Sequence, residues 1–121
     1  MATILIVDDE FSIVEALVEI ISWEGFDTQS ATNGRDGLDK LRKGGISLVV
    51  ADQMMPVMNG VQMVHEMRAD PALKSIPLVL MTAAPRALPP GDGSWDALLV
   101  KPFGVEEMTS TIRKLLATPR A

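Results

Sequence analysis

Four short, unbroken apolar runs constrain most strongly what this chain can fold into. They occupy residues 4–7, 48–51, 78–81 and 97–100. Each has the length of a β-strand, and apolarity without alternation is typical of strands that are covered on both faces. A more polar run at residues 26–30 predicts a fifth strand at an edge of the sheet.

The segments between these runs have helical spacing. Two apolar stripes stand out, one formed by Phe11, Val14, Leu17, Val18 and Ile21, the other by Val105, Met108, Ile112 and Leu115. Asn59, with Gln62 three residues on, predicts the capped start of a third helix. Strands that alternate with helices predict an α/β fold with a doubly wound parallel sheet. Right-handed crossovers favour the flavodoxin-like five-strand order 2-1-3-4-5.

One connection breaks this alternation. Residues 83–95 should supply the fourth helix, yet they contain Pro89, Pro90, Gly91 and Gly93. An interior proline costs a helix about 3 kcal/mol. We therefore expect a Pro/Gly-rich loop in place of the helix, with at most one turn that begins at Pro85.

Composition excludes several classes of function. The chain has 121 residues, which suits one domain, expected at residues 1–117 with a tail or linker at 118–121. It has no cysteine and one histidine, His65, so thiolate and multi-histidine metal sites are excluded. A net charge of −5 argues against direct binding to nucleic acid. Without a signal peptide or an apolar span, we expect a cytoplasmic protein that does not bind membranes.

The residues that follow the apolar runs carry the chemistry. Asp8 and Asp9 follow the first run, Asp52 the second, Thr82 the third and Lys101 the fourth. Ligands of an open parallel sheet bind at the carboxyl ends of its strands. The predicted fold therefore gathers three carboxylates, a hydroxyl and an ammonium group at one edge.

These groups together suggest phosphoryl transfer onto an aspartate. Clustered carboxylates repel one another unless a cation neutralises them, and ligation by oxygen alone favours Mg²⁺. A carboxylate can act as the nucleophile and a lysine can balance the phosphoryl charge. We interpret His65 as a surface residue rather than a phosphohistidine.

The chain resembles the receiver domains of bacterial two-component response regulators over nearly its whole length. The resemblance rests on Asp8–Asp9, on Asp52 with 55-Met-Pro-56 and 59-Asn-Gly-60, on 82-Thr-Ala-83, and on 101-Lys-Pro-Phe-103. It implies that Asp52 is the phosphoacceptor. It also implies that the Mg²⁺ ligands are Asp8, Asp9, Asp52 and the backbone carbonyl of Met54. Lys101, before a cis proline, would contact the phosphoryl group, and Thr82 would be the switch hydroxyl.

Three features depart from the family pattern. Three residues before the lysine, where the family normally has a Tyr or Phe that acts in the switch, this chain has Leu98. The usual coupling between movement of Thr82 and rotation of that aromatic side chain is therefore in doubt, although Trp95 is nearby. Met54 and Ala84 occupy positions at which polar residues often tune hydrolysis, so we expect an altered phosphate lifetime. The missing fourth helix suggests that partners use a different or remodelled face.

Three functions compete. The first is a switch that takes a phosphoryl group from a histidine kinase or phosphotransfer protein and changes its binding to a downstream partner. Such a protein is not an enzyme in the ordinary sense, because it catalyses only its own phosphorylation and dephosphorylation. The second is a receiver-like adaptor that works without phosphorylation. The third is a small Mg²⁺-dependent phosphatase, which the adjacent aspartates and the short chain disfavour.

Overall fold

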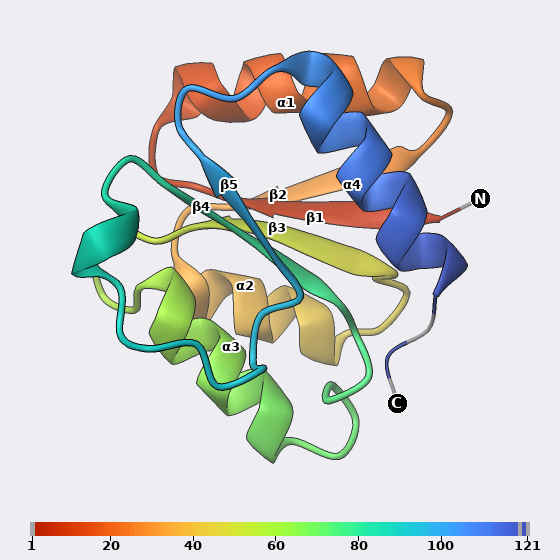
Figure 1. The fold of residues 1–121 in the computed structure, drawn as a ribbon. Coiled ribbons are helices and arrows are strands. Elements are labelled where there is room, and N and C mark those ends of the chain that lie inside the picture. Colours follow the sequence, from red (N-terminus) through yellow and green to blue (C-terminus); the bar gives the residue numbers. More distant parts are fainter. Residues whose placement is uncertain (1, 119, 121) are drawn as a thin grey trace.

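The fold is a three-layer α/β structure (Figure 1). A computed structural model describes residues 2–118 and 120. The strands are β1 (Thr3–Val7), β2 (Asp27–Ala31), β3 (Leu48–Asp52), β4 (Leu78–Thr82) and β5 (Ala97–Val100). The helices are α1 (Phe11–Trp23), α2 (Gly34–Arg42), α3 (Gly60–Ala69) and α4 (Val105–Ala117). Within the described residues, no helix is long and apolar enough to span a bilayer.

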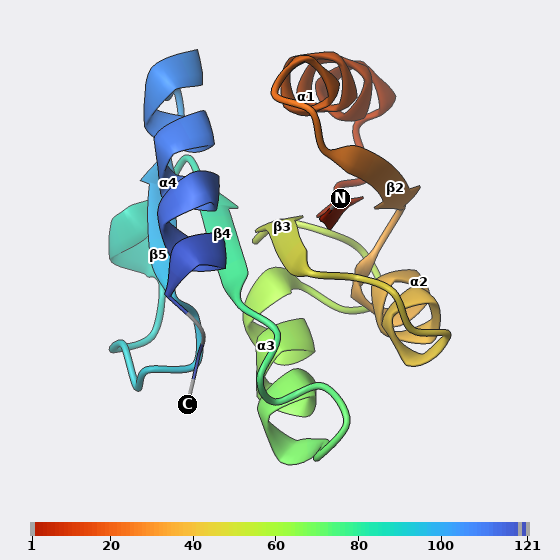
Figure 2. The same ribbon diagram turned by 90° about the vertical axis from the view of Figure 1, so that its right-hand side faces the viewer.

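The sheet confirms the predicted topology. Its five strands are parallel in the order β2-β1-β3-β4-β5, with the polar strand β2 at one edge. α1 and α4 cover one face, and α2 and α3 cover the other (Figure 2). The domain is therefore wound on both sides of the sheet, as right-handed crossovers require.

Each apolar run contributes side chains to two hydrophobic cores, one on each face of the sheet, because successive side chains of a strand point to opposite faces. In β1, Ile4 and Ile6 pack with α1 and α4, whereas Leu5 and Val7 pack with α2 and α3. All four are fully buried. The absence of polar alternation in the sequence follows directly from this double burial.

A local sequence signal explains the start of α3, whereas the predicted stripes of α1 and α4 need correction at their first residues, Phe11 and Val105, because Val105 is also exposed. Asn59 and Gln62 form the predicted capping box at the start of α3. The prediction that Phe11 belongs to the buried stripe is wrong, since 74% of Phe11 is exposed. Phe11 is the first residue of α1 and does not belong to the core cluster that contains Leu17 and Ile21.

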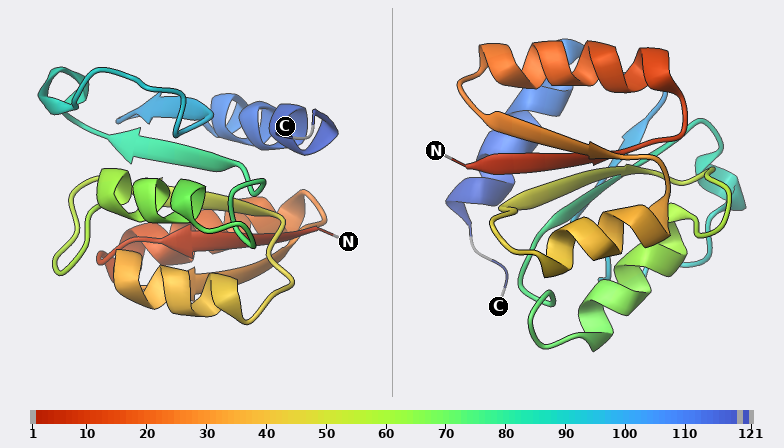
Figure 3. Two further views of the ribbon diagram at one scale, coloured as in Figure 1. Left: turned by 90° about the horizontal axis from the view of Figure 1, so that it is seen from below. Right: turned by 180° about the vertical axis from the view of Figure 1, so that it is seen from behind.

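The connection from β4 to β5 runs along the outside of the sheet (Figure 3). It contains one 3-10 turn, Pro85–Ala87, with Pro85 at its first position, and residues 88–96 form no helix. We predicted that this connection replaces the fourth helix of the family, and this stays a prediction. β5 is less covered than its apolar sequence suggests, because Val100 is 42% exposed at the sheet edge. Of the predicted tail at 118–121, residues 119 and 121 lie outside the described residues.

Candidate functional site

The strand register brings the predicted site residues to one edge of the sheet. Val7 pairs with Ala51, so Asp8 and Asp52 follow at adjacent strand ends. The Lys101 N–H donates to the Thr82 carbonyl at 2.8 Å, which sets the end of β5 beside the end of β4. The carboxyl ends of β1, β3, β4 and β5 therefore present the acids, the hydroxyl and the lysine together, as the sequence predicted.

Three carboxylates form the centre of this edge. Oxygen atoms of Asp8, Asp9 and Asp52 all lie within 4.8 Å of one another. Asp8 and Asp52 are buried, at 1% and 5% exposure, whereas Asp9 is exposed. The cluster therefore has a buried base and one acid that faces solvent.

Lys101 is the cation of the site. Its Nζ lies 2.8 Å from Oδ1 of Asp52 and 4.0 Å from Oδ2 of Asp8. Burial lowers the pKa of Lys101, but the hydrogen bond and charge of Asp52, with the charge of Asp8, outweigh burial and raise it. Lys101 is therefore charged at neutral pH. The peptide bond to Pro102 is cis, as the family resemblance implied.

Asp8 shows that the site fits a further cation. Its Oδ1 accepts a hydrogen bond from the Glu10 N–H at 3.0 Å, but its buried Oδ2 has no hydrogen-bond partner. Burial raises the pKa of Asp8, and the charges of Asp52 and Asp9 add to this effect against the opposing Glu10 N–H and Lys101. An orphaned buried oxygen beside two more carboxylates is the donor set that a hard cation such as Mg²⁺ requires.

Thr82 ends β4 with its hydroxyl at the same edge. The residue is 2% exposed, and its Oγ1 accepts a hydrogen bond from the Ala84 N–H at 3.0 Å. The hydroxyl proton therefore stays free to donate. Leu98 is partly buried and, like Trp95, packs against the core on the α2 and α3 side. Trp95 is thus a packing residue.

The segment that follows Asp52 is held close to the strand. The Gly60 N–H bonds to the Gln53 carbonyl at 3.3 Å, and the Gln53 side chain accepts from the Val61 N–H at 2.9 Å. A Cβ atom on Gly60 would lie 2.8 Å from the Asp52 carbonyl oxygen. Glycine is therefore needed where α3 begins against the end of β3. Met54, whose carbonyl is a predicted metal ligand, is 74% exposed.

The sequence comparisons agree with this geometry. The family model described as "Response regulator receiver domain" matches residues 4–113. The chain belongs to this family. It is 34% identical over 120 residues to the "Transcriptional regulatory protein CpxR homolog" of Haemophilus influenzae, covering 96% of this chain and 51% of that protein. It is also 34% identical over 116 residues to the "DNA-binding response regulator MtrA" of Mycobacterium tuberculosis, covering 93% of this chain and 50% of that protein. The receiver chain thus spans about half the length of these curated relatives.

Solved receiver structures share the fold. Response regulator protein TrrA from Thermotoga maritima, solved in complex with Mg(2+)-BeF, has a TM-score of 0.84 and 33% identity. The match covers 94% of this chain and 98% of that chain. Chemotaxis response regulator CheY4 of Vibrio cholerae has a TM-score of 0.83 and 28% identity, with the same coverage. Response regulator receiver domains act as signalling switches, and this chain carries their fold with an acidic cluster at the carboxyl ends of β1 and β3.

Sequence reasoning missed two supporting features of the receiver. It treated Gly60 as part of a motif without its packing role, although a glycine after a capping asparagine is a usable signal of close approach. It also missed the positive φ of 69° at Val57, in the loop after Asp52. A β-branched residue gives no sequence signal for that conformation.

Proposed function

We propose that this receiver domain accepts a phosphoryl group on Asp52 and thereby changes its affinity for a protein partner. The observation that carries the proposal is the buried Asp52 carboxylate, which faces Lys101 at 2.8 Å inside a cluster of three acids. The donor class is a histidine kinase or a histidine phosphotransfer protein, as the family resemblance implies.

In the transfer, a carboxylate oxygen of Asp52 bonds to phosphorus while the bond from phosphorus to the donor breaks. The departing electron pair stays on the donor nitrogen or oxygen. Lys101 holds Asp52 in position beforehand and neutralises charge that develops on the transferred group. Because burial excludes most water from Asp52, this electrostatic contribution is stronger than it would be at the surface.

Asp8, Asp9, Asp52 and the Met54 carbonyl would hold Mg²⁺. The ion, when bound, supplies positive charge that offsets the acids and the incoming phosphoryl oxygens. The partnerless Oδ2 of Asp8 supports this assignment, because a buried carboxylate oxygen without a donor costs free energy unless a ligand occupies it.

Thr82 is the group best placed to report phosphorylation. Its free hydroxyl proton can donate to a phosphoryl oxygen on the neighbouring strand. Because β5 carries Leu98 rather than an aromatic residue, movement of Thr82 is not transmitted by a change of aromatic rotamer at that position. The β4–β5 connection, which lies directly after Thr82, is the segment that we expect to move.

The test is incubation with Mg²⁺ and acetyl phosphate, followed by intact-mass measurement. We expect one phosphoryl addition in the natural chain and none in Asp52→Ala, with Asp36→Ala, an aspartate of α2, as the matched control that keeps the addition. No addition to the natural chain would favour an adaptor that works without phosphorylation. Repeated turnover of a small phosphoester would favour a phosphatase.

A further inference from the structure

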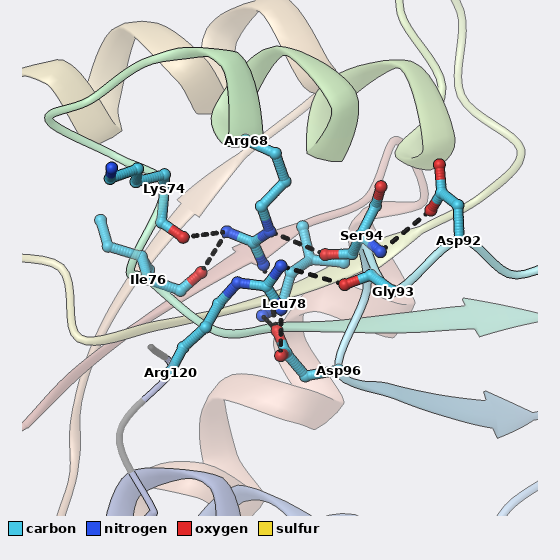
Figure 4. Close-up of polar contacts among 9 residues, drawn as sticks. All are labelled: Arg68, Lys74, Ile76, Leu78, Asp92, Gly93, Ser94, Asp96 and Arg120. Carbon is cyan, nitrogen blue, oxygen red and sulfur yellow. Dashed lines mark hydrogen bonds and ion pairs between the residues drawn. The ribbon is translucent and has the colours of Figure 1, made fainter.

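Arg68, Asp96 and Arg120 form a second charged cluster (Figure 4). It lies where β4 and β5 begin, at the end of the sheet opposite Asp52, which ends β3. Arg68 projects from α3, Asp96 lies just before β5, and Arg120 follows α4. The Asp96 N–H donates to the carbonyl of Leu78, the first residue of β4, at 2.9 Å. The cluster thus joins three segments that are far apart in the sequence.

Arg68 is the fixed part of this cluster. Its guanidinium donates to the backbone carbonyls of Lys74 at 3.2 Å, Ile76 at 2.8 Å and Ser94 at 2.8 Å. It also donates to Oδ2 of Asp96 at 3.0 Å, and that oxygen accepts from the Leu78 N–H at 2.9 Å. Arg68 and Oδ2 of Asp96 are therefore satisfied without any contribution from Arg120.

Arg120 uses the other carboxylate oxygen. Its Nη1 donates to Oδ1 of Asp96 at 2.7 Å, and its Nη2 donates to the Gly93 carbonyl at 3.0 Å. The two oxygens of Asp96 are thus divided between the two arginines. The Arg120 contacts can be removed without breaking any contact of Arg68.

Repulsion between the two arginines opposes the Arg120 contact. One carboxylate lies between two guanidinium groups, so the cluster carries an excess positive charge. Burial lowers the pKa of Arg68, and the nearby charge of Arg120 lowers it further, which shows that the two arginines repel each other. The Arg120 side chain is 25% exposed, whereas that of Arg68 is 13% exposed. Arg120 is therefore the member of the cluster that water and salt reach most easily.

We propose that the Arg120 side chain is a latch that docks onto residues 93–96 and that opens without unfolding the domain. The docking site is Oδ1 of Asp96 together with the Gly93 carbonyl, and its occupant is the guanidinium group of Arg120. When closed, the latch ties Arg120 to the β4–β5 connection, whose other end follows Thr82. The latch does not depend on phosphorylation of Asp52.

Hydrogen exchange measured by mass spectrometry tests the latch in the unphosphorylated chain. In Arg120→Ala we expect about five-fold faster exchange in peptides that cover residues 91–97 and 112–118, because local opening no longer breaks the Arg120 contacts. Arg120→Lys should restore part of the protection, since an ammonium cannot form the two-pronged contact. Arg35→Ala, which removes an exposed arginine of α2, is the control and should leave both peptides unchanged.

Two further hydrogen-exchange measurements separate the latch from a general loss of stability. High salt should speed exchange of these peptides in the natural chain but not in Arg120→Ala. In an Asp96→Asn background, Arg120→Ala should have little additional effect. Equal exchange in the natural chain and Arg120→Ala would overturn the latch. Faster exchange spread evenly over every peptide would also overturn it, because that pattern reports a loss of global stability.

Discussion

Lys101 lies between two buried acids, with its Nζ 2.8 Å from Oδ1 of Asp52 and 4.0 Å from Oδ2 of Asp8. The lysine is the only cation within 4.0 Å of these carboxylates among the described residues. This relationship links the stability of the site to its chemistry, since the same ammonium group that offsets the buried acids also faces the proposed phosphoacceptor.

We therefore expect Lys101→Met to lower the rate of phosphorylation by acetyl phosphate about 100-fold, as removal of one stabilising donor does in other sites. The variant keeps a side chain of similar length but lacks the charge that holds Asp52. Lys74→Met, which removes an exposed lysine, is the control and should keep the natural rate. The measurement is the initial rate of phosphoryl addition by mass. An unchanged rate in Lys101→Met would contradict the proposed role.

Asp8→Asn should raise the Tm at neutral pH in metal-free buffer. Burial raises the pKa of Asp8, so between the ordinary and the raised value the folded chain keeps a proton that the unfolded chain has released. The free energy of unfolding consequently falls as pH rises through that range, and the cost of the buried charge is complete above it. Asparagine removes this cost while keeping the shape of the side chain.

Two controls sharpen the Asp8 prediction. The Tm difference should vanish well below the ordinary pKa of aspartate, where Asp8 is protonated in both states. Mg²⁺ should stabilise the natural chain more than Asp8→Asn, because a ligand that binds only the folded state raises the Tm. Asp9→Asn, at the exposed acid, should shift the metal-free Tm far less. A lower Tm for Asp8→Asn at neutral pH without metal would refute the prediction.

Gly60→Ala should destabilise the domain by about 1–3 kcal/mol, the usual cost of overpacking. The new Cβ would lie 2.5 Å from Cδ1 of Leu80, which can move, and 2.8 Å from the backbone oxygen of Asp52, which cannot. The gain of about 1 kcal/mol in helix propensity is too small to compensate. Gly91→Ala, with its nearest contact at 3.9 Å, is the matched control. Denaturant unfolding measures both, and equal stabilities would be evidence against the close approach.

Val57→Gly should stabilise the domain by about 1 kcal/mol, because glycine adopts the left-handed conformation without a steric penalty. The φ of Val57 is 69° and the residue is 79% exposed, so little packing is lost. Val57→Ala keeps a Cβ and should recover only a small part of this gain. Chemical denaturation of the three chains checks the order, and a glycine variant less stable than the alanine variant would show that Val57 is not strained.

Much of the fold could be predicted from sequence because the strongest signals are physical requirements of the sheet. Doubly covered strands need continuous apolarity, as in β3, and the polar residue that ends such a run marks the edge where ligands bind. Asp52 and Lys101 were therefore predictable from their positions after two runs. The capping box of Asn59 was predictable because its contacts are local.

Other features depend on contacts that no local pattern encodes. Phe11 continues a helical stripe in sequence, yet as the first residue of α1 it is 74% exposed. Arg68 and Arg120 meet on Asp96 only because α3, β5 and α4 converge at one end of the sheet. Long-range pairing of this kind follows from tertiary packing, so periodicity and spacing could not indicate it.

The most direct test of the central claim is to locate the phosphoryl group. After reaction with acetyl phosphate and Mg²⁺, borohydride reduces an aspartyl phosphate to homoserine, and peptide mass spectrometry then identifies the residue. We predict homoserine at Asp52 alone, in a yield that falls sharply when Mg²⁺ is removed. Homoserine at Asp8 or Asp9, or at no residue while the chain remains folded, would contradict the assignment of Asp52 as the phosphoacceptor.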